Sequence, residues 1–362
     1  MKILFLTRRF FPDVGGVETH VLEISKELIS RGHEVVILTE TAPKDKHTNK
    51  RNYQSIEQSD TYYINSRNGA KSSQTAHFEP HLIKIISINT VNKVSSKKMG
   101  IWREMYKRRE LISQADVVHC HDVFFWYLPF RFLYPTKKIF TTFHGYETNF
   151  PPKTGAIFIR KISEMLSNGN ICVGEYIHKW YGTNYDYLTY GGVNKKNKSK
   201  KVTNNKVEIV FVGRIERDVG VNKYLSLLKE LRDKNISFNF TAIGDGSLKN
   251  SFKKYGKVIG FVKNPESYIS NSDIVFASSY LSMLEALIEK KDVVAVYDND
   301  LKKDYLEMSP FKNYVNILGP KDELKSLDGL KIKGGFKWAS EQTWGNVTDI
   351  YLRLWNKTSE IF

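Results

Sequence analysis

The chain has 362 residues, of which 41% are hydrophobic and 26% are charged, a balance that is typical of a folded globular protein and excludes wholesale disorder. The length suits two domains of ordinary size. The sequence contains no run of about eighteen apolar residues that could span a bilayer. The formal net charge is +16, and residues 1–200 hold 30 Lys and Arg against 18 Asp and Glu. This excess favours an anionic partner: nucleic acid, anionic lipid or a phosphorylated substrate.

The first part of the chain alternates strands and helices. Residues 3–7 and 34–39 have the pattern of buried strands, and residues 19–31 between them carry apolar side chains at helical spacing. This predicts a βαβ unit. Residues 42–77 are polar and aperiodic, which predicts an excursion or a loop.

Further short elements complete a first α/β domain over residues 1–193. Residues 97–114 form a basic segment, and residues 124–134 are a helix or an irregular aromatic stretch. The expected strands are 82–88, 116–121, 138–144, 170–174 and 187–190.

A run rich in lysine and asparagine, 194–206, is too polar to join a core and predicts a basic linker. Beyond it the alternation restarts, which predicts a second doubly wound domain over 207–340. A terminal segment, 341–362, contains an amphipathic helix near 344–355, which we expect to pack back toward the first domain. The expected strands are 207–212, 238–243, 258–262, 273–277 and 293–297, and the expected helices are 222–234 and 282–291.

The two cysteines, Cys120 and Cys172, are too few for a disulfide scaffold and lack the spacing of metal ligands. We therefore expect core cysteines and no metal site. The apolar run before Arg8 is far shorter than the core of a signal peptide, which predicts a cytoplasmic protein.

Two adjacent glycines, Gly15 and Gly16, lie between the first strand and the first helix. Without a Cβ, their amides can approach a ligand closely, and the helix directs its positive dipole end to the same place. This pattern predicts a nucleotide or sugar-phosphate site.

In the second domain, Arg214 follows the first strand, where it can bind phosphate through a guanidinium fork, although a surface arginine is ordinarily only solvated. Gly244 lies in a second glycine turn, for which a simple tight turn is the more frequent explanation. Glu285 lies close to the apolar stripe of its helix, where ribose hydroxyls could be its partners; an early-turn glutamate stabilised by the helix dipole is an equal alternative. The amides of Leu281, Ser282 and Met283 are expected to be free to hold phosphate.

Histidines end two strands of the first domain. His144 stands beside Gly145 at a strand terminus and is our candidate for contact with a bound sugar. His119, His121 and Asp122 end the preceding strand but lack the other features of a metal site, and the role of His121 stays open.

Together these residues resemble the retaining family-4 glycosyltransferases of the GT-B fold, also called group 1 glycosyltransferases. The order and spacing of the motifs make the resemblance specific, and it covers nearly the whole chain. The motifs are Gly15-Gly16-Val17-Glu18, Phe143-His144-Gly145, Tyr190-Gly191-Gly192-Val193, Val212-Gly213-Arg214-Ile215, Ile243-Gly244-Asp245-Gly246 and Leu284-Glu285-Ala286.

The resemblance implies two Rossmann-like domains that face a cleft, and a metal-independent enzyme that needs no cofactor besides its nucleotide-sugar substrate, a UDP-, GDP- or ADP-sugar. Gly16 would offer amides to the diphosphate and Arg214 would neutralise it. Glu285 would bind the ribose, and His144 would contact the donor sugar. The acceptor would be a hydroxyl of a glycan or of a lipid-linked molecule.

Two positions depart from the pattern of the family. Val219 stands where the family usually has a lysine, and it stays open whether the nearby Arg217 substitutes for that lysine. Ala277 stands where the family commonly has a glutamate. A sugar-nucleotide-binding protein with little activity is therefore an alternative. A basic nucleic-acid-binding protein is a weaker one, because no recognition motif is present.

The basic residues between Lys93 and Arg109 lie near the aromatic segment 124–132 in the sequence. Basic and aromatic residues together suit an anionic membrane surface that carries a lipid-linked acceptor, which would make the protein peripheral at the inner face of a membrane. The alternative is a solvated charge run beside core aromatics.

Overall fold

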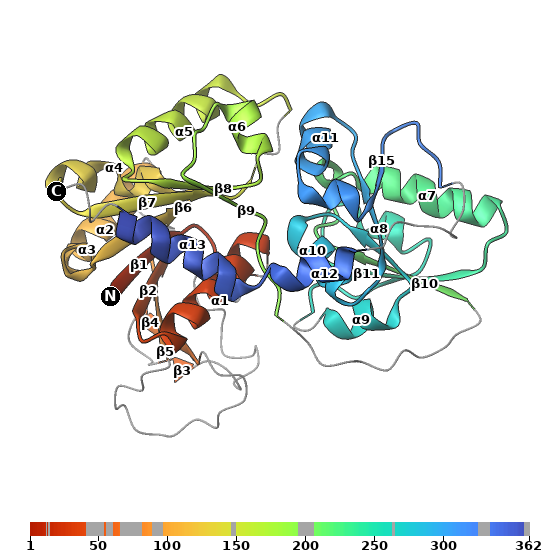
Figure 1. Ribbon diagram of the computed structural model, residues 1–362, viewed down its shortest axis with the longest axis horizontal. Coiled ribbons are helices and arrows are strands. Elements are labelled where there is room, and N and C mark those ends of the chain that lie inside the picture. Colours follow the sequence, from red (N-terminus) through yellow and green to blue (C-terminus); the bar gives the residue numbers. More distant parts are fainter. Residues whose placement is uncertain are drawn as a thin grey trace.

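The computed structural model describes residues 1–11, 13, 15–40, 54–55, 61–65, 82–88, 97–145, 150–194, 206–262, 265–324 and 334–357. The chain forms two Rossmann-like α/β units, each built on a mainly parallel sheet (Figure 1). Within these ranges no helix is long and apolar enough to cross a membrane. The predicted linker lies outside the described residues, except for Asn194 and Lys206.

The first sheet has nine strands in the order β3-β4-β5-β2-β1-β6-β7-β8-β9. Its central strand, β1, pairs in parallel with β2 and β6, so that Phe5 lies between Ile37 and His119. Among the described strands, β4 pairs antiparallel with both β3 and β5, and the other pairs in this sheet are parallel. The strands are β1 (Lys2–Thr7), β2 (Glu34–Thr39), β3 (Gln54–Ser55), β4 (Thr61–Asn65), β5 (Leu82–Ser87), β6 (Val117–His121), β7 (Lys138–Phe143), β8 (Asn170–Val173) and β9 (Tyr187–Thr189).

The prediction of an excursion over 42–77 is wrong for residues 61–65, which form β4 and extend the edge of the sheet. The rest of that segment, apart from β3, lies outside the described residues. Strand β4 pairs with β3 on one side and with β5 on the other, and its Thr, Tyr and Ile residues favour strands, but they stand in a segment that is polar overall.

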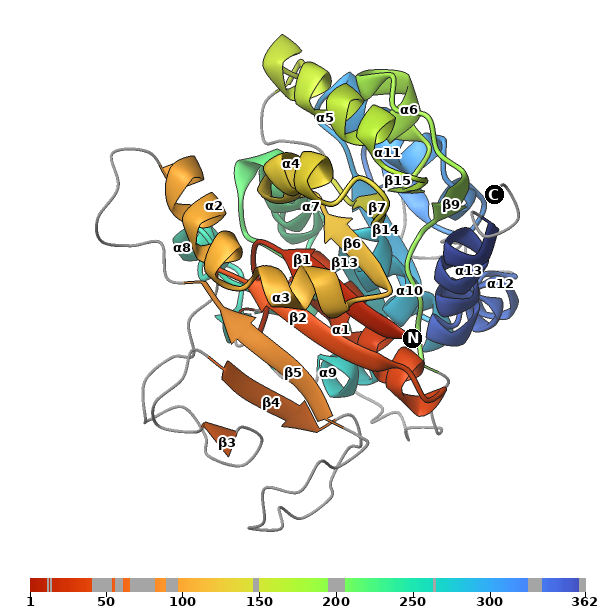
Figure 2. The ribbon, with the colours of Figure 1, turned by 90° about the vertical axis from the view of Figure 1, so that its left-hand side faces the viewer.

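Helices cover both faces of this sheet (Figure 2). Helices α1 and α13 (Trp344–Lys357) pack on the face that carries Ile3 and Phe5, whereas α2, α3 and α4 cover the face that carries Leu4 and Leu6. The remaining bounds are α1 (Gly16–Ser30), α2 (Lys97–Lys107), α3 (Arg109–Gln114), α4 (Phe124–Leu133), α5 (Thr154–Leu166) and α6 (Tyr176–Tyr181). Helix α1 begins at Gly16 and not at Thr19, because the second glycine already belongs to its first turn.

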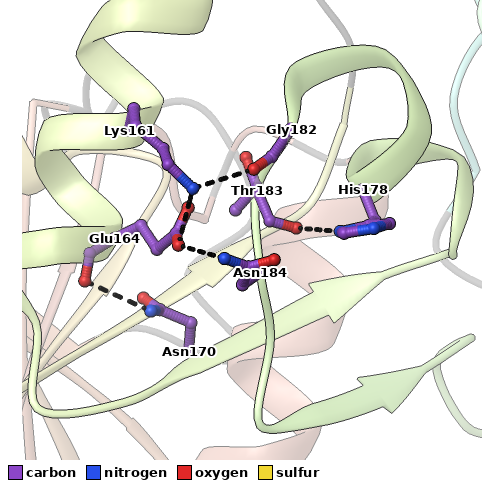
Figure 3. A network of polar contacts seen from close by, with 7 residues as sticks. All are labelled: Lys161, Glu164, Asn170, His178, Gly182, Thr183 and Asn184. Atoms are coloured by element: carbon purple, nitrogen blue, oxygen red, sulfur yellow. Dashed lines mark hydrogen bonds and ion pairs between the residues drawn. The ribbon is translucent and has the colours of Figure 1, made fainter.

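A polar network fixes the outer edge of this unit, where α5 lies above β8 (Figure 3). Lys161 Nζ donates to the Gly182 carbonyl at the end of α6 (3.0 Å) and to the carboxylate of Glu164 (2.9 Å). Glu164 also accepts a hydrogen bond from Asn184 Nδ2 (3.0 Å). The sequence did not point to α5 or α6 as helices, and these contacts are part of what positions them.

The second sheet has six parallel strands in the order β12-β11-β10-β13-β14-β15. Strand β12 ends at Val258, whereas the sequence pattern predicts a strand as far as Val262. The strands are β10 (Val207–Val212), β11 (Phe238–Ile243), β12 (Lys257–Val258), β13 (Ile274–Ala277), β14 (Asp292–Val296) and β15 (Asn316–Leu318). The helices are η1 (Arg217–Val219), α7 (Val221–Asp233), α8 (Lys249–Phe252), α9 (Glu266–Asn271), α10 (Tyr280–Ile288), α11 (Asp300–Glu307), η2 (Pro310–Asn313) and α12 (Gly335–Glu341).

The chain passes between the two units twice, and the two crossings lie side by side. Val193 forms a parallel bridge with Thr343, and its N–H donates to the Gln342 carbonyl at 2.8 Å. After the second crossing, α13 packs against α1 of the first unit (Figure 1).

Side chains of α13 reach into the polar interior of the first unit. The Tyr351 hydroxyl lies 2.9 Å from His20 Nε2 and 2.8 Å from Thr142 Oγ1, and Trp355 Nε1 donates to His119 Nδ1 at 3.0 Å. The terminal helix therefore contributes both apolar and hydrogen-bonding contacts to the first unit.

The two units also touch through side chains. Trp180 Nε1 in α6 donates to Asp304 Oδ2 in α11 at 2.8 Å, and Lys179 forms an ion pair with the same carboxylate at 2.7 Å. The rings of Tyr176 and Tyr305 meet edge to face beside this contact, with centroids 5.2 Å apart. One hydrophobic cluster accordingly runs through both units.

The contribution of α13 can be tested with two leucines on the same helix. Leu354 is 1% exposed, whereas Leu352 is only partly buried. We expect Leu354→Ala to lower the free energy of unfolding by about 2–5 kcal/mol, because it leaves a cavity in the core. Leu352→Ala should cause a smaller loss in the same denaturation experiment, and equal losses would contradict this packing.

Candidate active site

The amino ends of α1 and α10, one from each unit, lie opposite each other. A Cβ built on Gly16 would lie 4.0 Å from Leu281 Cδ1, an ordinary van der Waals distance. Leu281 belongs to the second unit but packs against the hydrophobic cluster of the first. The fold thus brings together two of the segments that the sequence singled out, from positions far apart in the chain.

Arg214 follows β10 and leaves the sheet at its carboxyl edge. Its side chain is 53% exposed, and its guanidinium donates to Asp218 Oδ2 at 2.6 Å. Ligands of open parallel sheets bind beyond the carboxyl ends of the strands, and Arg214 lies at that edge. Its contact with an anionic ligand remains a prediction.

The two departures from the family pattern are both core residues. Val219 is 6% exposed and packs in the apolar cluster that also contains Val221 and Val296. Ala277 is 1% exposed at the end of β13. Neither position is open to the surface.

Gly244 serves the packing of the backbone at this edge. Its φ is +144°, and a Cβ at this position would collide with the Gly213 carbonyl oxygen. Its N–H donates to the Gly260 carbonyl at 2.9 Å. These contacts account for the glycine without a ligand, and a role for Gly244 in nucleotide binding remains a prediction.

The expectation of free amides at the start of α10 is wrong for two of the three residues. Ser279 and Ser282 form a capping box in which the Ser279 side chain accepts from the Ser282 N–H, and the Met283 N–H donates to the Ser279 carbonyl at 3.0 Å. Leu281 is the remaining member whose amide a ligand could use. Glu285, half-buried, lies one turn further along α10.

Gly15 makes room for a carboxylate. A Cβ on Gly15 would collide with Glu18 Oε2. Glu18 is 9% exposed, and burial raises the pKa of its carboxyl group, although a bond from its own N–H and the nearby charge of Arg9 oppose the rise. An acidic side chain therefore already occupies the amino end of α1, where the helix dipole favours an anion.

Four histidines meet at the carboxyl ends of β6 and β7. His144 Nε2 lies 2.8 Å from His121 Nδ1, and the ring of His20 meets that of His144 edge to face at 4.7 Å between centroids. His119 stacks on His121 with centroids 5.1 Å apart. The sequence predicted His144 for this site and left His121 open, but it did not point to His20, which lies on α1 at the distance of a helical turn from Gly16.

Burial keeps these histidines uncharged. It lowers the pKa of His20, His119 and His121 well below the ordinary value, and it lowers that of His144 to about 3, with a smaller contribution from the nearby Arg160 guanidinium. In the part of the chain that the structure describes, no group of three His, Cys, Asp or Glu side chains has the arrangement of a metal site.

Asp122 and Arg160 orient His144; the sequence named Asp122 only as part of the group that ends the preceding strand, and it did not point to Arg160. Asp122 has a φ of +59°, and its carboxylate accepts a hydrogen bond from the His144 N–H at 3.1 Å. Arg160 lies 3.8 Å from that carboxylate and donates to the Gly145 carbonyl. Arg160 is in α5, and only the tertiary structure brings it to this strand end.

Comparison with known proteins agrees with this architecture. Residues 14–188 match the model of Glycosyltransferase Family 4, and residues 193–289 match that of Glycosyl transferases group 1. No curated protein matches the sequence.

Solved structures of glycosyltransferases superpose on nearly the whole chain. TarM is 15% identical with a TM-score of 0.65, over 98% of this chain and 99% of its own. A glycosyltransferase from Rickettsia africae is 16% identical with a TM-score of 0.66, over 99% of each chain. Starch synthase IV from Arabidopsis thaliana, bound to ADP and acarbose, is 12% identical with a TM-score of 0.60, over 98% of this chain and 99% of its own.

The fold is therefore that of the two-domain GT-B glycosyltransferases. Because the two family models together match residues on both units, the chain belongs to the family-4/group 1 glycosyltransferases. Its activity is glycosyl transfer.

The histidine cluster predicts how stability depends on pH. An unfolded histidine binds a proton near pH 6.5, whereas His144 in the folded chain does so only at about pH 3. Since the unfolded state then binds more protons, stability should fall as the pH drops below 6.5, by about 1.4 kcal/mol per pH unit for each such histidine. Unfolding measured from pH 7 to pH 5 checks the slope. His144→Asn should make this slope smaller by the contribution of one histidine, about 1.4 kcal/mol per pH unit. An unchanged slope would contradict the lowered pKa of His144.

Proposed function

We propose that this protein transfers a sugar from a UDP-, GDP- or ADP-sugar to a hydroxyl of a glycan or lipid-linked acceptor, with retention of the anomeric configuration. The observation that supports this proposal is the contact between Gly16 of the first unit and Leu281 of the second. Glu285 lies on the same helix as Leu281, and His20, whose ring meets that of His144, lies on the same helix as Gly16. Two of the similar solved structures contain a nucleoside diphosphate: a TarM mutant is in complex with UDP, and starch synthase IV is bound to ADP.

In this proposal the bond between the anomeric carbon and the departing phosphate oxygen breaks while the acceptor oxygen bonds to the same face of that carbon. The acceptor proton passes to the departing phosphate oxygen, so no protein nucleophile is needed. Arg214, the amides of Gly16 and Leu281 and the turn at Gly244 contact the diphosphate, whose negative charge grows as the bond breaks. Protein groups thus supply the stabilisation that a metal ion supplies in other transferases.

Glu285 and His144 have separate roles. The half-buried Glu285 carboxylate accepts hydrogen bonds from the ribose hydroxyls. His144 is neutral, so its ring can exchange hydrogen bonds with a sugar hydroxyl without adding charge. Asp122 and Arg160 fix the backbone on either side of it.

The donor-site assignment is tested by screening UDP-, GDP- and ADP-sugars for thermal stabilisation and turnover. Arg214→Ala should lower turnover about 10²–10³-fold, the usual loss when one group that stabilises a developing anion is removed. Glu285→Ala should weaken donor binding about tenfold to hundredfold. Lys229→Ala, at an exposed lysine on α7 of the same unit, is the control and should have little effect.

The same screen should give equal turnover with Mg²⁺ and with a chelator. If no donor stabilises the wild type, or if Arg214→Ala changes nothing, this assignment fails. Donor binding without turnover would instead favour the sugar-nucleotide-binding alternative.

We also propose that helices α2, α4 and α5 form the surface that meets an anionic membrane. These helices contact one another in series. Large apolar side chains on and beside them are exposed: Met99, Tyr106, Phe132, Leu133, Phe150, Phe158, Ile159 and Met165. Exposed lysines and arginines lie among them, including Lys98, Arg103 and Arg109. Apolar side chains rimmed by positive charge suit a lipid surface.

Vesicles of phosphatidylcholine with and without phosphatidylglycerol test this surface. We expect binding to the anionic vesicles only, and we expect replacement of Phe158 and Ile159 together by Ser to weaken it. Phe261→Ser, which removes an exposed aromatic ring from the second unit, is the control. Equal binding to both kinds of vesicle would contradict the proposal.

A further inference from the structure

A lysine of the second unit, Lys302, is buried without a carboxylate directly bonded to it in the described structure. It lies in the first turn of α11 and is 2% exposed. Its Nζ donates to the Ser278 carbonyl at 3.0 Å and lies 4.0 Å from the centroid of the Tyr305 ring. Lysine is almost never fully buried unless its charge is compensated, so we ask which group compensates the charge of Lys302.

The surroundings of this ammonium are those of the proposed donor site. The Ser278 carbonyl directly follows β13 and precedes the capping residue of α10. The charged groups that act on Lys302 are Arg214 and Asp218 from the segment after β10, and Asp298 from the segment after β14. Three neighbouring strand ends therefore converge on one buried cation.

Protonation of Lys302 is finely balanced. Its pKa is lowered to about 7, chiefly by burial and also by the Arg214 guanidinium, while Asp218 and Asp298 act in the opposite direction and raise it. An ammonium has three N–H donors, and among the described residues the Ser278 carbonyl accepts from one. The group thus has donors left for an anion, and an anion would favour its charged form.

We propose that Lys302 Nζ binds the diphosphate of the donor beside Arg214, as a second cation that stabilises the leaving group. This inference rests on the proposed function. Arg214 is already paired with Asp218 at 2.6 Å, so a diphosphate that used Arg214 alone would have to compete with that carboxylate. Because Val219 is buried in the core, the loop after β10 offers no cation from that position, and α11 supplies one from the other side.

The test is calorimetric titration of the wild type with UDP, GDP and ADP, each compared with its own nucleoside. At pH 8 Lys302 is mostly neutral before binding, so the protein should take up nearly one proton when the nucleotide binds. The uptake is measured by repeating the titration in buffers of different ionisation enthalpy. The affinity for the nucleotide should fall about tenfold between pH 7 and pH 8.5. Phosphate groups, with a second pKa of about 6, do not titrate in this window, and neither do the neutral histidines of the first unit.

Variants separate a binding role from a structural one. Lys302→Met should weaken nucleotide binding about tenfold to hundredfold, abolish the proton uptake and leave nucleoside binding unchanged. Lys302→Arg should remove the pH dependence, because a guanidinium stays charged. Lys303→Met, the next residue on α11, is the control and should keep both properties of the wild type.

Stability gives a further readout. A buried lysine with a lowered pKa costs stability wherever it is charged, so the thermal midpoint of Lys302→Met should be at least that of the wild type at pH 6. A lower midpoint together with unchanged nucleotide affinity and proton uptake would assign Lys302 a purely structural role and overturn the inference. If no nucleotide binds the wild type, the proposed function fails first; if one binds without proton uptake, only the inference on Lys302 fails.

Discussion

The packing of the amino end of α10 is the constraint on which the relation between the two units depends. Tyr280 stacks on Tyr305 at 4.0 Å between ring centroids and meets Tyr190 at 5.2 Å, while its N–H donates to the Tyr305 hydroxyl. The next residue, Leu281, packs into the apolar cluster of the first unit. Because closely packed side chains tolerate little displacement, these contacts hold α10 at the boundary and bring Glu285 with it.

Charge is distributed unevenly around this boundary. The first unit contributes four histidines that burial keeps neutral, whereas the second contributes Arg214 and the buried Lys302. An anionic ligand would therefore be held by the second unit, and the first would present polar groups that carry no net charge. This asymmetry follows from the environment of each residue, since the sequence of the first unit is the more basic of the two.

Much of the fold could be predicted from the sequence because buried parallel strands are continuous apolar runs and their helices are strongly periodic. Strands β1, β2, β10 and β11 and helices α1, α7 and α13 were all recognisable in this way. Helices α5, α6 and α11 were not predicted. For α5 the reason is that it buries only Ala156 and Ser163 while apolar side chains lie on its outer face. The contacts that position α5, such as those of Lys161 with Glu164 and with the Gly182 carbonyl, cannot be recognised in the sequence.

The residues of the candidate site divide in the same way. Arg214, Glu285 and His144 could be proposed because each stands at a strand end or on a helix stripe next to a recognisable motif, although their roles remain proposals. Lys302 and Arg160 could not, because their positions depend on where a helix crosses a sheet edge formed by distant strands. The amides of Ser282 and Met283 look free in the sequence, yet local capping already uses them.

The sequence by itself determined the two-unit α/β architecture and allowed the kind of site to be proposed, because local periodicity and strand-end motifs are encoded within short stretches of chain. Only the tertiary structure decided which cations and histidines meet at the boundary, how Glu18 occupies the end of α1, and how α13 returns to the first unit. Those outcomes depend on contacts between residues far apart in the chain and on burial, which sets the charge of each group.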